Sequence, residues 1–125
     1  MTIHVATPVG GVAVPNTALT DVLIMDVSNE SVLGIQIDVT GFALNGFTVQ
    51  GRMNSAGSYF TLYSVAADYT SPTRLVIQAS GDLTTQAVGS GWLIMNCGPL
   101  ESIKFQAKSS NASGSGIVIK AGKKA

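Results

Sequence analysis

The sequence predicts an all-β domain, an antiparallel β-sandwich or jelly-roll-like fold of about eight to ten short strands. Three observations support this fold class. Apolar and polar residues alternate with a period of two in several segments, and no segment carries the 3.6-residue apolar stripe of an amphipathic helix. Charged residues make up only 11% of the chain, whereas exposed helices normally use many of them. The 125 residues also include 14 glycines, which suit tight turns.

The first 20 residues contain no Asp, Glu, Lys or Arg, and they hold two weak candidate strands near residues 3–6 and 12–14. We expect residues 1–20 to form an N-terminal arm, and residues 21–125 to form a single β-sandwich domain with a short basic C-terminal tail. The arm is apolar enough to leave solvent, for example by adding a strand to the sheet edge of a neighbouring subunit. Its candidate contact residues are Ile3, Val5, Val12 and Val14.

Strands are expected in eight further segments. VLIM at 22–25 and WLIM at 92–95 are short continuous apolar runs, which predict strands covered on both faces. They are too short to cross a bilayer, which takes about 20 apolar residues. Residues 59–65 form an aromatic candidate strand. Alternation predicts the other strands at 35–40, 47–52, 74–79, 103–108 and 117–120. Turn signals between the segments include Gly41, Asn45-Gly46 and the stretches 54–57, 71–72, 80–82, 89–91 and 109–116.

The two apolar runs also reveal an internal similarity at an offset of 70 residues. Each half reads as apolar strand, turn, alternating strand, small-residue loop and alternating strand. Either a duplication or two halves of similar three-strand geometry without common ancestry would produce this pattern, since alternating strands match at some even offset. The identical pairs are Leu23/Leu93, Ile24/Ile94, Met25/Met95, Gln36/Gln106 and Gly46/Gly116.

Catalytic and metal-binding motifs are sparse. His4 is the one histidine and Cys97 the one cysteine, whereas a metal site needs several ligands at compatible spacing. Cys97 follows an apolar strand, so we expect a small buried hydrophobe. Asp26 and Asp38 could face each other across adjacent strands like a glycosidase pair, but Asp26 better suits a turn with Ser28. We therefore expect no enzymatic activity, no cofactor and no metal.

Tyr59 and Tyr63 would project from the same side of their predicted strand. Exposed aromatic side chains on a sheet can stack on sugars, or they can pack against a neighbouring subunit, where Tyr is favoured. We prefer the subunit interface.

All seven acidic residues lie at or before position 101, and five lysines follow it. This basic end is either a solvated surface or a contact with an acidic partner or neighbouring subunit. The candidate contact residues are Lys120, Lys123 and Lys124. Lysines without clustered arginines and interleaved aromatics are a weak signal for nucleic acid, so neither nucleic acid nor a membrane is an expected partner.

One long stretch, residues 64–110, reads SVAADYTSPTRLVIQASGDLTTQAVGSGWLIMNCGPLESIKFQAKSS. Its order of small-residue strand, Gly/Ser turn, apolar strand and alternating strand resembles small structural proteins of tailed bacteriophages, over roughly residues 58–121 as a compositional pattern. These include capsid decoration (cement) proteins, which are β-sandwiches or jelly rolls bound outside the major capsid shell, and tail and head-fibre components.

The resemblance implies a virion structural protein, assembled in the cytoplasm of the bacterial host. Its partner would be the major capsid protein or another virion protein, and a homo-oligomer is expected. Many copies on a lattice would add many modest contacts. The alternative is a tail- or fibre-associated carbohydrate-binding module.

Overall fold

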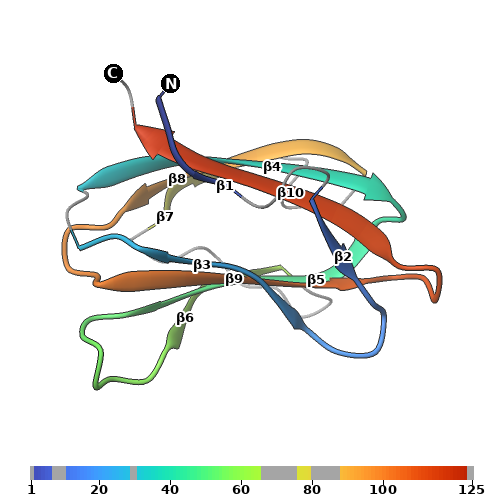
Figure 1. The fold of residues 1–125 in the computed structure, drawn as a ribbon, viewed down its shortest axis with the longest axis horizontal. Helices are drawn as coiled ribbons and strands as arrows, with labels where there is room; N and C mark the ends of the chain where they lie inside the picture. The colour runs from blue at the N-terminus through green and yellow to red at the C-terminus, as the bar shows by residue number, and fades with distance from the viewer. Residues whose placement is uncertain (1, 7–10, 29–30, 66–75, 80–87, 124–125) are drawn as a thin grey trace.

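The computed structural model describes residues 2–6, 11–28, 31–65, 76–79 and 88–123, which form ten strands and no helix. Every strand pairing is antiparallel, and the strands lie in two packed sheets (Figure 1). The predicted all-β sandwich is therefore confirmed. The strands are β1 (Thr2–Ala6), β2 (Val12–Val14), β3 (Thr20–Asp26), β4 (Val32–Gly41), β5 (Leu44–Arg52), β6 (Phe60–Val65), β7 (Val76–Ala79), β8 (Gly89–Asn96), β9 (Ser102–Ser109) and β10 (Ser115–Lys123).

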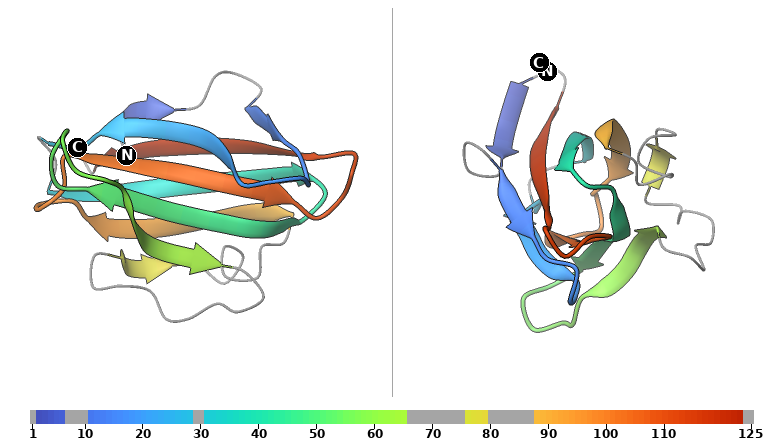
Figure 2. Two further views of the ribbon diagram at one scale, coloured as in Figure 1. Left: turned by 90° about the horizontal axis from the view of Figure 1, so that it is seen from below. Right: turned by 90° about the vertical axis from the view of Figure 1, so that its right-hand side faces the viewer.

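The larger sheet has six strands in the order β1-β10-β4-β8-β7, with β2 also paired to β10. The smaller sheet has four strands in the order β3-β9-β5-β6. Figure 2 shows the long central strands running side by side in each layer. Alternation along each strand directs one face into the space between the sheets. The core there includes Phe47 and Phe105, whose ring centroids lie 6.3 Å apart.

The N-terminal arm forms part of the larger sheet. β1 and β2 pair in succession with the same edge of β10, from the Thr2–Lys123 pair to the Val14–Ser115 pair. Gly11 precedes β2 with a φ of 82°, and a Cβ placed there would lie 2.6 Å from the Ile117 carbonyl oxygen. A glycine is needed at this position because any other side chain would clash with the backbone of β10.

The two LIM segments differ from the prediction that both of their faces are covered. β3 leaves Ile24 53% exposed, with Leu23 partly buried and Met25 buried beside it, and β8 leaves Trp92 39% exposed between buried Gly91 and Leu93. Both strands thus have one inner and one outer face. The prediction was wrong because a run of apolar letters does not reveal that its outward residue lies on an uncovered sheet.

Asn45-Gly46 was also wrongly predicted as a turn, since both residues lie within β5. The chain reverses just before them, at Phe42 and Ala43, after Gly41 with a φ of 83°. The irregularity at Gly46 is a register shift against β9, so the Asn-Gly signal marks a β-bulge. In the predicted strand over 74–79, residues 74 and 75 lie outside the described residues.

The 70-residue similarity corresponds to two interlocked halves. The segment β3-β4-β5 and the segment β8-β9-β10 exchange their middle strands, giving β3-β9-β5 in one sheet and β8-β4-β10 in the other. The β3–β9 and β8–β4 pairs have the same register under the 70-residue offset, since Leu23 pairs with Phe105 and Leu93 pairs with Ile35. The registers of the β5–β9 and β10–β4 pairs differ by two residues, since Phe47 pairs with Ala107 but its counterpart Ile117 pairs with Val39. The two halves are therefore similar in strand order and in the register of their first pair.

Candidate functional site

The outer face of the four-stranded sheet carries a ladder of polar side chains. Gln106 Nε2 donates to Asp21 Oδ1 at 2.7 Å, and Thr48 Oγ1 donates to Gln106 Oε1 at 3.3 Å. These three residues are direct cross-strand neighbours on β3, β9 and β5. The ladder ties three strands together, and its polar groups are largely satisfied by one another.

Tyr59 lies just before β6, on the same sheet, and its ring is covered by cations. Lys104 Nζ lies 4.5 Å from the ring centroid and Arg52 Cζ lies 4.9 Å from it, both within cation–π range. The Tyr59 hydroxyl is 2.8 Å from Ser102 Oγ, and Arg52 Nε is 3.0 Å from Glu101 Oε2. The ring therefore works as a strut between neighbouring strands and presents little open aromatic surface.

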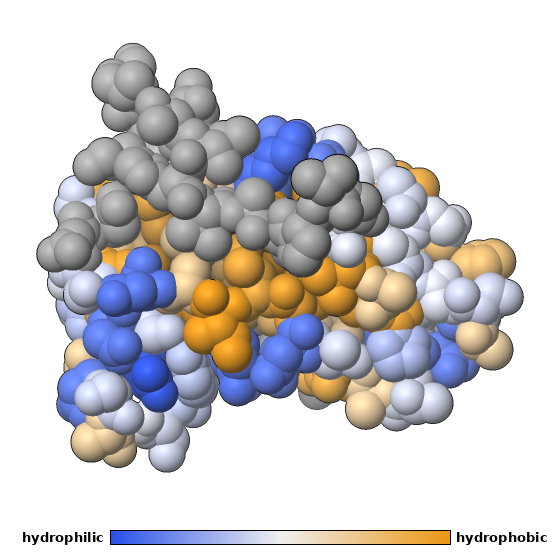
Figure 3. Space-filling model, in the orientation of Figure 1, coloured by the Kyte–Doolittle hydropathy of each residue, from blue (hydrophilic) through white to orange (hydrophobic). Residues whose placement is uncertain are grey.

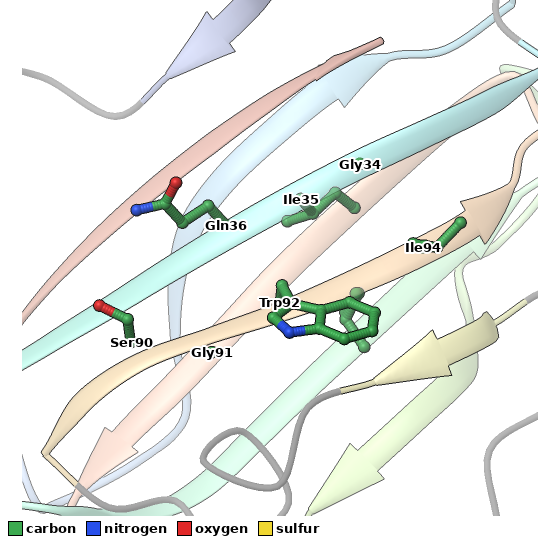
Figure 4. A pocket seen from close by; sticks show the side chains of 8 residues that line it. Gly34, Ile35, Gln36, Ser90, Gly91, Trp92 and Ile94 are labelled. Carbon is green, nitrogen blue, oxygen red and sulfur yellow. The ribbon is translucent and has the colours of Figure 1, made fainter. Parts of the chain in front are cut away.

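The outer face of the six-stranded sheet is built differently around Trp92 on β8. Trp92 pairs directly with Gln36 on β4, and Gln36 pairs in turn with Lys120 on β10. Beside the indole lies an open groove of about 290 Å³, lined mainly by backbone and apolar atoms of β4 and β8. Figure 4 shows the indole extending along β8 toward Ile94. Gly34 on β4 also lines the groove and adds no side chain to it.

A polar group borders this groove on its other side. Ser90 Oγ donates to Asp38 Oδ1 at 2.5 Å, and Gln36 Nε2 lies 3.3 and 3.4 Å from the two oxygens of the same carboxylate. In Figure 4 the Gln36 amide and the Ser90 hydroxyl point together, away from the indole. The groove is thus apolar beside Trp92, and its other end, at Gln36 and Ser90, adjoins the Asp38 carboxylate.

Apolar side chains lie along β3, at the edge of the four-stranded sheet, and on the neighbouring β2. Figure 3 shows apolar atoms gathered in a band across the middle of this side of the molecule. Val12 and Leu23 are partly buried against the core, and Ile24, which pairs with Lys104, is exposed on the outer side of β3. We call this edge of the sandwich, with Ile24 on its outer side and Val12 and Leu23 toward the core, the β3 face. The sequence signal for it is the VLIM run, whose continuous apolar residues predict a strand covered on both faces.

The predicted contact residues are spread over several places. Val14 is 1% exposed and belongs to the chain's own core, whereas Val12 reaches the β3 face. Lys120 is half-buried in the row of Gln36 and Trp92. The backbones of Ile3, Val5 and Lys123 take part in the β1–β10 pairing, and that of Tyr63 pairs with Val49. The side chains of these four residues, and all of Lys124, lie outside the described residues.

The residues considered for chemistry are not brought together. Cys97 is buried, as expected, and the backbone of His4 lies in β1. Asp26 ends β3 in one sheet and Asp38 lies on β4 in the other, so they are not neighbours on adjacent strands. The Ser28 hydroxyl and amide both donate to Asp26 Oδ1, at 2.6 and 2.8 Å, and lower the pKa of that carboxyl.

The described part of the chain lacks two further features. It holds no group of three or more His, Cys, Asp or Glu side chains that could hold a metal ion. In the same residues, no helix has the length and apolar character needed to cross a membrane.

Comparison with known proteins gives a structural neighbour. No protein-family profile matches the chain, and no curated protein matches it in sequence. The fold is similar to the crystal structure of the SPBc2 prophage-derived protein YomS, with a TM-score of 0.50 and 11% sequence identity. The alignment covers 98% of this chain and 99% of that one. The two proteins share the same overall β-sandwich.

Proposed function

We propose that this protein is a structural component of a bacteriophage particle, and that it acts as a capsid decoration protein bound to the outside of the major capsid shell. The observation that carries the proposal is the β3 face, where Ile24 is 53% exposed on a chain with few charges. An apolar face on a soluble β-sandwich favours association with another protein surface. The prophage origin of the structural neighbour supports a phage setting.

The proposed mechanism is stabilisation by burial. Each square ångström of apolar area removed from water contributes about 25 cal/mol before the costs of association. Exposed ion pairs contribute only about 0–1 kcal/mol each and are screened by salt. A decoration subunit that bridges shell subunits through its β3 face would therefore hold them at high salt, with Lys120, Lys123 and Lys124 tuning approach and register. No catalytic step is required.

The N-terminal arm adds a route to homo-oligomers. β1 and β2 pair with β10 of their own chain, and the same edge pairing can be made with β10 of a second copy. This exchange would join neighbouring decoration subunits while keeping the pairing seen within one chain. Ile3 and Val5 would then form part of the contact between copies.

The shell contact is tested by titrating the protein onto undecorated shells of the phage whose genome encodes it. Ile24→Asp places a charge in the β3 face, and we expect shell affinity to fall at least tenfold because the carboxylate must lose its water. Met53→Asp is the matched control, since Met53 is also exposed but lies in the turn between β5 and β6. Equal binding by both variants and the unchanged protein would contradict the proposed contact.

A further inference from the structure

We propose that the groove beside Trp92 is a carbohydrate-binding site, in which one sugar ring stacks on the indole while its hydroxyl groups bond to the Asp38, Gln36 and Ser90 side chains. This site lies on the outer face of the six-stranded sheet, apart from the β3 face. It does not rest on the proposed capsid role. It also differs from the tyrosine platform predicted from the sequence, because it uses neither Tyr59 nor Tyr63.

The apolar half of the site is accessible because Gly34, the diagonal neighbour of Trp92 on β4, has no side chain. Trp92 is 39% exposed, and the groove beside it is bordered by Gly34 and Ile94, which pair with each other. The volume of about 290 Å³ is just below the roughly 300–1,000 Å³ typical of small-molecule sites. A site of this size accepts one or two sugar units.

The polar half has the groups that sugar hydroxyls need. Asp38 pairs with Ser90, and Trp92 follows two residues later on the same face of β8. Such diagonal neighbours lie about 7–8 Å apart, a separation that one sugar ring can bridge. An ionised carboxylate has about four acceptor positions, and Asp38 accepts here from Ser90 Oγ and Gln36 Nε2. It can therefore also accept from hydroxyl groups of a ligand.

The chemistry of the groove favours a sugar over a protein surface or a lipid chain, the two other kinds of occupant that an apolar groove can accept. A protein surface or a lipid chain laid across Trp92 would cover the Asp38 carboxylate, and a charge removed from water without new partners is costly. A sugar ring offers both C–H groups for the indole and hydroxyl donors for the carboxylate. Lys120, which pairs with Gln36, borders the row and can donate to a further hydroxyl or to an acidic sugar.

The test uses the single tryptophan as its own reporter. The full-length protein is titrated with soluble oligosaccharides of neutral hexoses, N-acetylhexosamines and uronic acids, and with bacterial surface polysaccharides, while tryptophan emission is recorded. We expect at least one sugar to shift the emission saturably. Asp38→Asn should lower the affinity for that sugar at least tenfold. Trp92→Ala should abolish retention of the protein on the immobilised sugar. Phe60→Ala is the matched control, since Phe60 is also an aromatic residue 39% exposed, on the other sheet.

Three outcomes would overturn the proposal. One is the absence of any sugar that shifts the emission or retains the protein. Another is an emission change that follows protein concentration alone and accompanies dimer formation in sedimentation, which assigns the groove to a second copy. The third is a shift produced by neutral phosphatidylcholine vesicles and not by sugars. Shell binding uses the β3 face, so failure of either proposal leaves the other unaffected.

Discussion

Tyr59 and Trp92 are aromatic residues on opposite outer faces of the sandwich. Their surroundings differ at one pair of equivalent positions, Lys104 on β9 and Gly34 on β4. Lys104 lies over the Tyr59 ring. The residue related to Lys104 by the 70-residue offset is Gly34, which lies beside Trp92 and leaves the groove open. The two halves share the strand register at these positions. The Tyr59 ring is thus covered by a lysine from β9, whereas the equivalent position on β4, at the groove beside Trp92, is a glycine.

The largest expected effect comes from making the two faces alike. Gly34→Lys places on β4 the residue that β9 has at Lys104, and we expect the lysine to cover the indole and to weaken sugar binding at least tenfold. Gly34 is not among the glycines of positive φ, which in the described residues are Gly11, Gly41, Gly89 and Gly114, so its backbone accepts a side chain.

This variant is checked by acrylamide quenching of Trp92 and by the sugar titration. Gly34→Ala is the control, because a methyl group is too short to reach over the indole. Unchanged quenching and unchanged sugar affinity in Gly34→Lys would show that this neighbour does not decide whether the aromatic face is open.

The next effect concerns stability on the other face. Tyr59→Ala removes two cation–π contacts, worth about 0.5–1 kcal/mol each at exposed sites, and a hydrogen bond to Ser102, worth about 1 kcal/mol. We expect the free energy of unfolding in urea to fall by about 2 kcal/mol. Tyr59→Phe should lose about 1 kcal/mol, since it keeps the ring and loses only the hydroxyl. A Tyr59→Ala variant as stable as the unchanged protein would mean that the contacts of the Tyr59 ring do not stabilise the sheet.

The smallest effect lies in two equivalent turns. Asp26 Oδ1 accepts from the Ser28 amide at 2.8 Å, and its counterpart Asn96 accepts from the Gly98 amide at 3.0 Å. Only Asp26 titrates. Its pKa is lowered in the folded protein by the Ser28 hydroxyl and amide, so its contribution to stability is present above the unfolded value, about 3.9, and is lost as pH falls through the folded pKa.

Asp26→Asn should make the two turns alike and remove this part of the acid dependence. The measurement is the urea midpoint of both proteins across the acidic pH range. The two curves of urea midpoint against pH should differ only slightly. The higher midpoint of the unchanged protein should fall to that of Asp26→Asn as the pH is lowered. If the unchanged protein instead gained stability over Asp26→Asn as the pH falls, the pKa of Asp26 could not be lowered in the folded protein.

Much of the fold could be predicted from the sequence because alternation is local. All ten strands were located, and residues such as Ile35 and Ile37 are buried as their period of two indicates. The partners of each strand could not be predicted in the same way. Ser90 and Asp38 are 52 residues apart in the chain, and only the exchange of middle strands brings them together.

The candidate sites were less accessible to sequence reasoning. Tyr59 stood out as an aromatic residue in a predicted strand, but the two cations that cover it come from other parts of the chain. Ile24 and Trp92 were hidden in apolar runs that looked like interior strands. Their exposure depends on which layer covers them, which is a property of the whole sandwich.

The most direct test of the capsid role is the melting of phage shells with and without this protein, at low and high salt. The proposed mechanism predicts saturable binding that survives moderate salt and raises the melting temperature of the shell, because apolar burial is not screened. Binding that disappears at moderate salt would contradict a contact dominated by burial. Saturating binding with no rise in shell stability would contradict the decoration role itself.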